Sequence, residues 1–168
     1  HNTLRRQRQM CIRDRVTDAA VVIGHAAWKF NWQRNDYDAL AGALAAGHII
    51  ECGCQATGGN YAFFKEVPSF DNVGYPIAEI LEDGSFYITK HPGTGGLVSK
   101  GTVTAQLLYE ISSPEYINPD VISHFDTLKI EDIEKDKVYV SGCRGSSPPK
   151  EHKVCINLAG GYRNGMEF

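Results

Sequence analysis

The sequence predicts an α/β protein in which a mixed sheet is flanked by helices and which forms an incomplete fragment of a larger domain. Two observations predict this class. The segment 37–50 is rich in Ala and Leu and repeats its apolar residues at helical spacing. The segment 77–90 holds two short apolar runs around Asp83-Gly84, a pair typical of hairpin turns. Helices and strands mix without a strict βαβ rhythm, so the strand order does not follow from the sequence.

Three helices are expected. The apolar segment 16–32 fits either a buried strand or a helix, and we favour a helix that begins near Asp18, whose carboxylate can cap it. The second helix is expected to begin after Asp36 and to stop at Gly53. The third, of about twelve residues, is expected to follow Gly96 and to end before the proline at 114. Its buried stripe comprises Val103, Leu107 and Ile111.

Strands dominate the last third of the chain. The segments 127–130 and 137–141 are expected to be strands separated by the charged run 131–136, and 153–157 is expected to be another. The polar segment 144–149, which begins with Arg144 and contains two prolines, is expected to be a flexible surface loop.

The composition excludes several classes of protein. The chain has 168 residues, of which 42% are hydrophobic and 22% charged, and this fits one folded domain rather than a disordered chain. No apolar run approaches the roughly 20 residues of a membrane-spanning helix, so no membrane partner is expected. The basic start lacks the apolar core of a secretory signal. Five scattered cysteines fit a reducing compartment, so we expect a cytoplasmic location.

Residues 1–14 are interpreted separately from the rest. The run at 10–15 (MCIRDR) resembles the translation of a transposon end used in preparing sequencing libraries. We therefore interpret 1–14 as an artefactual leader outside the fold; the alternative is a basic arm that binds nucleic acid. Without this leader the chain is more acidic than its net charge of −3 indicates. An acidic body without an aromatic and basic stripe is a poor nucleic-acid binder, so no such partner is expected.

The most informative segment is 91–99 (HPGTGGLVS). Glycines before a helix let the backbone approach a ligand, and a helix N-terminus presents unpaired N–H groups and a positive dipole end. Thr94, Gly95 and Gly96 are therefore candidate ligand-binding residues for a phosphate, a carboxylate or the phosphates of a coenzyme A thioester. The alternative is a tight turn before a helix. If the loop binds an anion, Gly95→Val should abolish binding with little loss of fold.

A second candidate site follows the 37–50 helix. His48 and Glu51 continue the buried stripe of that helix directly before another Gly-rich loop. A histidine held by a carboxylate is an acid–base unit, so both are candidate catalytic residues; the alternative is a hydrogen-bonded core histidine beside a solvated glutamate. Asp18 is a candidate for helix capping or for ligand binding. The second loop adds the candidate ligand-binding residues Thr57, Gly58, Gly59 and Asn60.

Other chemistries find little support in the sequence. Cys52 and Cys54 form a C-x-C pair without a second Cys or His pair at ligand spacing, so no metal site is expected. Two buried thiols are the favoured interpretation, because a thiol nucleophile would need His48 folded back onto it. The sequence contains neither a Walker loop, a dinucleotide fingerprint nor a Gly-x-Ser-x-Gly elbow. No cofactor is identified.

Six segments together resemble the acyclic terpene utilisation (AtuA-like) family. They lie at 15–20 (RVTDAA), 47–53 (GHIIECG), 55–60 (QATGGN), 74–79 (GYPIAE), 93–99 (GTGGLVS) and 106–111 (QLLYEI). The resemblance runs in order through the chain, and it implies that residues 15–168 are the C-terminal portion of the family's longer main domain. Cys54 departs from the small residue expected at that position.

The resemblance implies a role in the degradation of acyclic terpenes such as citronellol and geraniol, or of branched organic acids, by way of coenzyme A thioesters. The resulting hypothesis is a catabolic enzyme or enzyme subunit that acts on an acyl-CoA-like, anionic small molecule, with the reaction type open. The alternative from another class is a non-catalytic partner that binds a metabolite or a sister subunit in the same pathway. A third hypothesis is a nucleotide-dependent ligase or kinase that uses the loop 93–96. An oligomer or a sister subunit is the expected protein partner.

Overall fold

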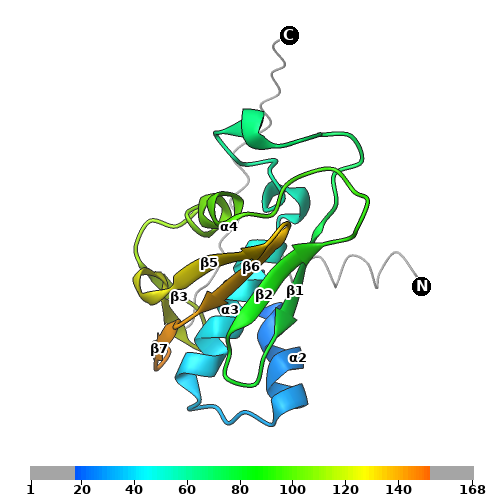
Figure 1. Cartoon of the computed structure of the whole chain (residues 1–168). Coiled ribbons are helices and arrows are strands. Elements are labelled where there is room, and N and C mark those ends of the chain that lie inside the picture. Colours follow the sequence, from blue (N-terminus) through cyan, green and yellow to red (C-terminus); the bar gives the residue numbers. More distant parts are fainter. Residues whose placement is uncertain (1–17, 152–168) are drawn as a thin grey trace, which may run out of the picture.

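Residues 18–151 are described by a computed structural model, and within them helices and strands combine as the α/β class predicts (Figure 1). The helices are α2 (Val21–Phe30), α3 (Tyr37–Ile50) and α4 (Lys100–Leu107). The strands are β1 (Pro76–Ile80), β2 (Phe86–Lys90), β3 (Glu115–Ile117), β4 (Ile122–His124), β5 (Lys129–Glu134), β6 (Lys137–Ser141) and β7 (Arg144–Ser146). The leader at 1–14 and the strand expected at 153–157 lie outside the described residues.

The strands pair in two antiparallel sheets. One has the order β1-β2-β6-β5, and the other has the order β3-β4-β7. The hairpin predicted at 77–90 is confirmed as β1 and β2, with Ile80 opposite Phe86 at its closed end. Gly84 in the turn has a φ of 81°, a conformation that favours glycine. A parallel bridge joins Val73 and Gly95, so two loop segments also run side by side.

Helix α3 lies between the two sheets and is buried along most of its length. It contacts β1 and β2 of the larger sheet, β4 and β7 of the smaller one, and both other helices (Figure 1). Every residue from Leu40 to Ile49 is buried, as expected for a helix that is apolar on all sides. Its small residues permit close approach: a Cβ at Gly42 would collide with the carbonyl of Gly84, and one at Gly47 with the carbonyl of Ala19.

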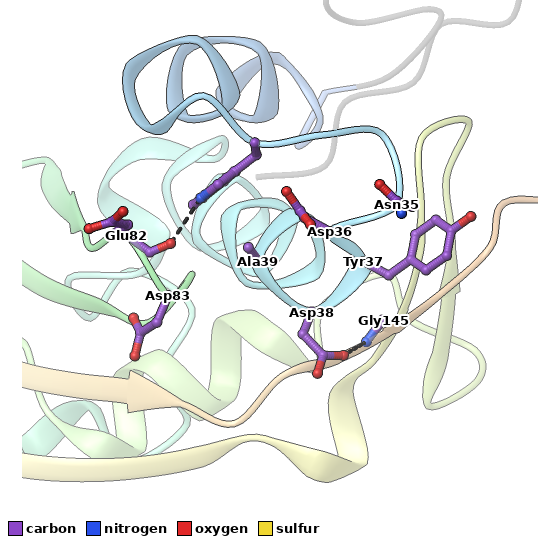
Figure 2. Close-up of a pocket in the computed structure, with 9 residues that line it drawn as sticks. Asn35, Asp36, Tyr37, Asp38, Ala39, Glu82, Asp83 and Gly145 are labelled. Atoms are coloured by element: carbon purple, nitrogen blue, oxygen red, sulfur yellow. Dashed lines mark hydrogen bonds between the residues drawn. The ribbon is translucent and has the colours of Figure 1, made fainter.

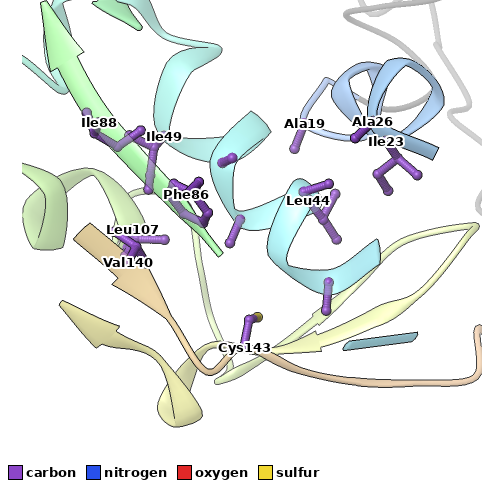
Figure 3. Packing of buried hydrophobic residues seen from close by; sticks show 14 of the residues in the cluster. Ala19, Ile23, Ala26, Leu44, Ile49, Phe86, Ile88, Leu107, Val140 and Cys143 are labelled. Atoms are coloured by element: carbon purple, nitrogen blue, oxygen red, sulfur yellow. The ribbon is translucent and has the colours of Figure 1, made fainter. Parts of the chain in front are cut away.

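The core that fixes α3 is formed by aliphatic and aromatic side chains from the helix and from the larger sheet (Figure 3). Leu44 and Ile49 of α3, Phe86 and Ile88 of β2, and Val140 of β6 are all fully buried. Burying each such side chain stabilises the fold by about 1.5–3 kcal/mol. The C-terminal turn of α3 is therefore held rigidly where it meets the polar residues described below.

The predicted helix starts need correction. Helix α2 begins at Val21 with Ala20 at its N-cap, so Asp18 is not the cap. Asp36 does occupy the N-cap position of α3, but its carboxylate accepts a hydrogen bond from the backbone N–H of Gln33, at 2.6 Å, instead of bonding into the helix. The sequence located both helices but placed their capping bonds wrongly. At α3 the reason is that the loop before it folds back, so that Gln33 takes up the Asp36 carboxylate. At α2 the helix starts later than expected.

The last helix and the last strands also differ from expectation. Helix α4 ends at Leu107 and leaves Ile111 outside it. Strand β5 continues through the charged run to Glu134 before a tight turn at Asp136, whose φ is 56°. Arg144 begins a strand rather than a flexible loop, because 144–146 pairs with β4 and is tied to α3 by the Arg144–Asp38 ion pair at 2.7 Å. Across residues 18–151 there is no helix with the length and apolarity that a bilayer span requires.

Candidate functional site

The predicted catalytic pair comes together at the C-terminal end of α3. His48 Nδ1 lies 2.9 Å from Glu51 Oε1, one helical turn further along the chain. The His48 side chain is 1% exposed and that of Glu51 is 11% exposed. This close imidazole–carboxylate contact is not aligned as a hydrogen bond. The Glu51 carboxylate lies against the imidazole ring at the edge of the core and is mostly buried. The structural alternative had expected a solvated glutamate.

Two aromatic rings pack against the imidazole. The Tyr116 ring from β3 lies 5.1 Å from the His48 ring, and the Phe125 ring lies 5.7 Å from it. The Tyr116 and Phe125 ring centroids are 5.3 Å apart, so both rings lie on the same side of the imidazole. The His48 Nε2 atom is buried and has no hydrogen-bond partner within residues 18–151. A buried ring nitrogen without a partner is unusual in a core whose only role is packing.

Two glutamines complete the polar cluster. Gln106 of α4 is fully buried and donates from Nε2 to the carbonyl oxygen of His48, at 3.3 Å. Its Oε1 atom is buried and unpaired in the described part of the chain, and so is Gln55 Oε1 in the turn after α3. We call the set His48, Glu51, Gln55 and Gln106 the polar cluster.

Burial and nearby carboxylates together shift the pKa values of the groups around the polar cluster. Burial, and then the charge of Glu51, raise the pKa of Tyr116 to about 12. Burial followed by the charge of Glu51 also raises the pKa of the Cys52 thiol above its usual value. Asp18 and the glutamate at 110 contribute in the same direction to both shifts. The Cys52 thiol is therefore protonated near neutral pH and is a poor nucleophile.

The two cysteines of the C-x-C pair are half-buried rather than buried, which corrects the sequence interpretation. Within residues 18–151 no group of three or more His, Cys, Asp or Glu side chains is placed to hold a metal ion. Asp18 lies two residues before the N-cap of α2, and its charge is felt by Cys52 and Tyr116. It is thus associated electrostatically with the polar cluster rather than with a helix cap.

The two predicted glycine loops meet. The Leu97 N–H donates to the carbonyl oxygen of Thr57 at 2.9 Å, and the Thr57 hydroxyl donates to the carbonyl oxygen of Gly74 at 2.6 Å. The amides from Thr57 to Asn60 bond back to the carbonyls of residues 54 and 55. The loop 57–60 is thus a closed turn against which the loop 94–97 packs.

The amides of the loop 94–97 are also occupied. Thr94 N–H donates to the carbonyl of residue 91, Gly95 N–H to that of residue 72, and Gly96 N–H to that of residue 69. The carbonyls of residues 69, 72 and 91 thus stand where the hypothesis placed an anion. The predicted mechanism, in which bare amides of this loop bind an anion, is not what the structure shows.

The start of α4 follows the same pattern. The helix begins at Lys100, and Ser99 and Thr102 form a reciprocal capping box. The Lys100 N–H donates to Asp132 Oδ1 at 2.7 Å, and the N–H of residue 98 donates to Asp136 Oδ1 at 3.0 Å. Two of the protein's own carboxylates therefore occupy the position of the expected anion, as the positive end of the helix favours.

A separate acidic pocket of about 510 Å³ lies between the start of α3, the β1–β2 turn and β7 (Figure 2). Its polar groups are engaged in holding these elements together. Trp32 donates from its indole N–H to the carbonyl oxygen of Glu82 at 2.8 Å, and Asp38 accepts from the N–H of Gly145 at 2.9 Å. Asp83 accepts from Ser85 within the turn. We attribute the acidic lining of this pocket to structure.

Comparison with known proteins adds a family. The model of the acyclic terpene utilisation family protein AtuA matches residues 1–168. The chain belongs to the AtuA family. No curated protein and no solved structure matches it. The AtuA family membership associates the chain with acyclic terpene utilisation, and each residue of the polar cluster has a buried polar atom without a hydrogen-bond partner within residues 18–151.

Sequence reasoning identified His48 and Glu51 but missed Gln106, Gln55 and Tyr116. Gln106 could have been found from the sequence, because it lies between Val103 and Leu107 on the buried stripe of its helix. A buried polar side chain needs a hydrogen-bond partner, so a glutamine at that position is unusual. Tyr116 carried no comparable signal, since it reaches the histidine only through the tertiary fold.

Proposed function

We propose that this AtuA protein is a catabolic enzyme or enzyme subunit of acyclic terpene or branched organic acid degradation, and that His48 and Glu51 form its acid–base unit. The observation that carries the proposal is the 2.9 Å contact of Glu51 with Nδ1 of a buried histidine whose Nε2 has no partner among residues 18–151. In this arrangement one nitrogen orients the ring and the other is available to exchange a proton with a substrate.

The residues around His48 and Glu51 fit these two roles of the imidazole nitrogens. Tyr116 and Phe125 pack on the imidazole and limit its rotation. Glu51 stabilises the positive charge that the ring gains when Nε2 accepts a proton, as the carboxylate partners of catalytic histidines do. Positioned general acid–base groups of this kind contribute about 10²–10⁴-fold to a reaction rate.

The substrate class remains an acyl-CoA-like anionic molecule, as the family resemblance implies. The amides at 94–100 are occupied, and Glu51 contacts Nδ1 of the imidazole whose Nε2 is proposed to react. The negative groups of such a substrate are therefore proposed to stay outside the polar cluster, while its reacting end approaches His48. This orientation avoids placing two negative charges together in a poorly solvated site.

The alternative function is a non-catalytic partner that binds a metabolite or a sister subunit in the same pathway. One observation favours it: the segment after Asn60 exposes several large aromatic side chains, more than an isolated surface usually presents together. These are Phe63, Phe64, Phe70 and Tyr75. An exposed aromatic group of this kind suits a protein partner better than a small molecule.

Solvent deuterium incorporation tests the acid–base proposal for reactions in which His48 exchanges a proton with a carbon atom of the substrate. The protein is incubated in D2O with coenzyme A thioesters of branched acids, and the deuterium content of the recovered thioesters is measured by mass spectrometry. We expect deuterium incorporation at carbon that falls by about 10²-fold or more in His48→Gln, because the proton-transferring nitrogen is removed. Glu51→Gln should show a smaller loss, since it removes the orienting charge and keeps the ring.

His25→Gln is the matched control, because His25 lies exposed on α2 and only contacts the carbonyl of residue 21. It should exchange deuterium at the rate of the unaltered protein. Equal rates in His48→Gln and His25→Gln would exclude the acid–base role. Absence of exchange in every protein, combined with capture of a pathway protein that is lost on replacing Phe63 and Phe64 by Ser, would favour the non-catalytic alternative.

A further inference from the structure

Helix α2 exposes an apolar face at the outside of the fold. Its buried side packs on α3, and its only polar side chains are His25 and Lys29 (Figure 1). The remaining side carries Val21, which is 41% exposed, and Trp28, which is 84% exposed. A helix that is apolar on nearly every side is normally covered on every side. The Trp28 face of α2 is therefore a surface that calls for a partner.

A glycine on the same face supports close approach of that partner. Gly24 lies one helical turn before Trp28, and a Cβ at Gly24 would meet no neighbouring element within 4 Å. Glycine inside a helix destabilises it relative to alanine, so it needs a reason. At Gly42 and Gly47 of α3 the reason is the backbone of another segment of the chain. At Gly24 a second molecule that approaches α2 as closely would supply it.

A cavity of about 700 Å³ opens beside this face, between α2, the start of α3 and the β3–β4 turn. Ala20 and Gly24 line it on the α2 side, and the buried Leu40 lines it on the α3 side. Gln33 and Asp120 add hydrogen-bond acceptors to the lining. Such a cavity suits an indole, whose ring is apolar and whose N–H needs an acceptor when it is buried.

The exposed tryptophan and the cavity match each other when two copies of the chain meet. If two α2 helices cross antiparallel with a two-fold axis at Gly24, residues that follow Gly24 in one copy face residues that precede it in the other. Trp28, four positions after the axis, then faces Ala20, four positions before it, and Ala20 lines the cavity. The symmetry repeats this contact, so each indole reaches the cavity of the other copy.

The charges around the face also fit a second copy. Exposed side chains of both signs surround it, namely Lys29, Arg34, Asp36 and Asp120. A surface that carries both signs can meet an identical surface without net repulsion, whereas a strongly acidic or basic partner would find no complementary field here.

We propose that α2 forms the interface of a two-fold symmetric dimer, in which Trp28 of each copy fills the cavity beside α2 of the other. The indole ring packs on Ala20 and Leu40 of the other copy, and its N–H donates to Gln33 or Asp120 there. The interface lies at the start of α3, whereas the polar cluster lies at its end. The dimer is therefore independent of the acid–base proposal.

Sedimentation equilibrium of the full chain from about 1 to 100 µM tests the proposal. We expect the average mass to rise with concentration from that of one chain towards that of two. Trp28→Ser should raise the dissociation constant about 30-fold or more, because a buried tryptophan anchor is lost. Lys29→Ser, about 100° away around the helix, should leave the constant unchanged. A chain that is monomeric throughout, or a dimer equally stable in Trp28→Ser, would overturn the proposal.

Gly24→Leu separates dimer formation from folding. Within one copy the new side chain meets open space, so circular dichroism should show a folded chain, but at the two-fold axis it holds the helices apart and should weaken the dimer. The control replaces Phe63 and Phe64 by Ser on the other exposed aromatic surface and should keep the dimer. Loss of the dimer in this control alone would place the contact on the segment after Asn60 and overturn the proposal.

Acrylamide quenching of tryptophan fluorescence is the second measurement. Trp28 is open to the quencher in a single copy, so quenching should decrease as the dimer forms, and this decrease should disappear in Trp28→Phe. Quenching that stays constant while the dimer forms would leave Trp28 outside the interface and overturn the proposal. Protection of Trp28 that needs a different protein, in a chain that is itself monomeric, would assign the face to that protein and also overturn it.

Discussion

At the level of single residues, His48 is distinguished by a buried ring nitrogen that has no hydrogen-bond partner within residues 18–151. Buried polar atoms in folded proteins nearly always find partners. Here two neighbouring aromatic rings pack against the imidazole, a carboxylate contacts one nitrogen, and the other nitrogen is unpaired within the described chain. Gln106 fixes the main chain at the same residue. The structural and the functional interpretation of His48 both stay predictions, and the His48→Gln experiment described above distinguishes them.

Cys52 provides a residue-scale prediction about pH. Because burial and the Glu51 charge raise its pKa, its thiolate forms only at higher pH than that of an unperturbed cysteine. At pH 8 we expect iodoacetamide to alkylate Cys52 more slowly than a cysteine in an unstructured peptide, as measured by mass spectrometry of the Cys52 peptide. Glu51→Gln should accelerate the reaction, whereas Glu66→Gln should not. Alkylation of Cys52 as fast as that of the peptide would contradict the assigned electrostatics.

At the level of elements, the start of α4 is held by distant carboxylates. Asp132 and Asp136 come from the β5–β6 hairpin, 32 and 38 residues beyond the amides they accept from. These bonds anchor the loop that precedes α4 to the larger sheet. The Gly95→Val expectation changes accordingly: a Cβ at Gly95 would collide with the carbonyl of Asp71, so we expect that variant to lose stability whether or not a ligand binds.

Asp132→Ala tests this anchoring role. Loss of a side-chain acceptor at a helix N-terminus costs about 0.5–2 kcal/mol, and we expect a decrease of that size in the free energy of unfolding in urea. Glu131→Ala, the neighbouring exposed carboxylate on the same strand, should change stability by less than about 0.5 kcal/mol. Equal effects of the two substitutions would show that the Asp132 contact does not stabilise the helix.

At the level of the whole molecule, α3 joins the two sheets and carries the polar cluster at its end. Its glycines set the distance to its neighbours, since a side chain at Gly42 would collide with the backbone of the β1–β2 turn. The same close approach keeps the turn after α3 fixed relative to both sheets. Stability of the core and placement of His48 are thus consequences of one packing arrangement.

Gly42→Ala is expected to destabilise the whole fold. The new methyl group meets a backbone carbonyl that cannot rotate away, and overpacking of this kind costs about 1–3 kcal/mol. Gly24→Ala is the matched control, because a Cβ there meets open space and a helical alanine is favoured over glycine by about 0.5–1 kcal/mol. Differential scanning calorimetry should show opposite shifts in Tm. A neutral Gly42→Ala would mean that α3 can move away from the hairpin.

The sequence by itself determined the α/β class, helix α3, the β1–β2 hairpin and the proximity of His48 to Glu51, because each of these depends on residues that are close along the chain. The family was also visible in short local segments. Only the tertiary structure decided that the amides at 94–100 are already occupied and that Gln106 and Tyr116 meet His48. Residues far apart along the chain can bind the same hydrogen-bond donors and acceptors as a ligand would. No local sequence pattern shows which of these hydrogen bonds form in the folded protein.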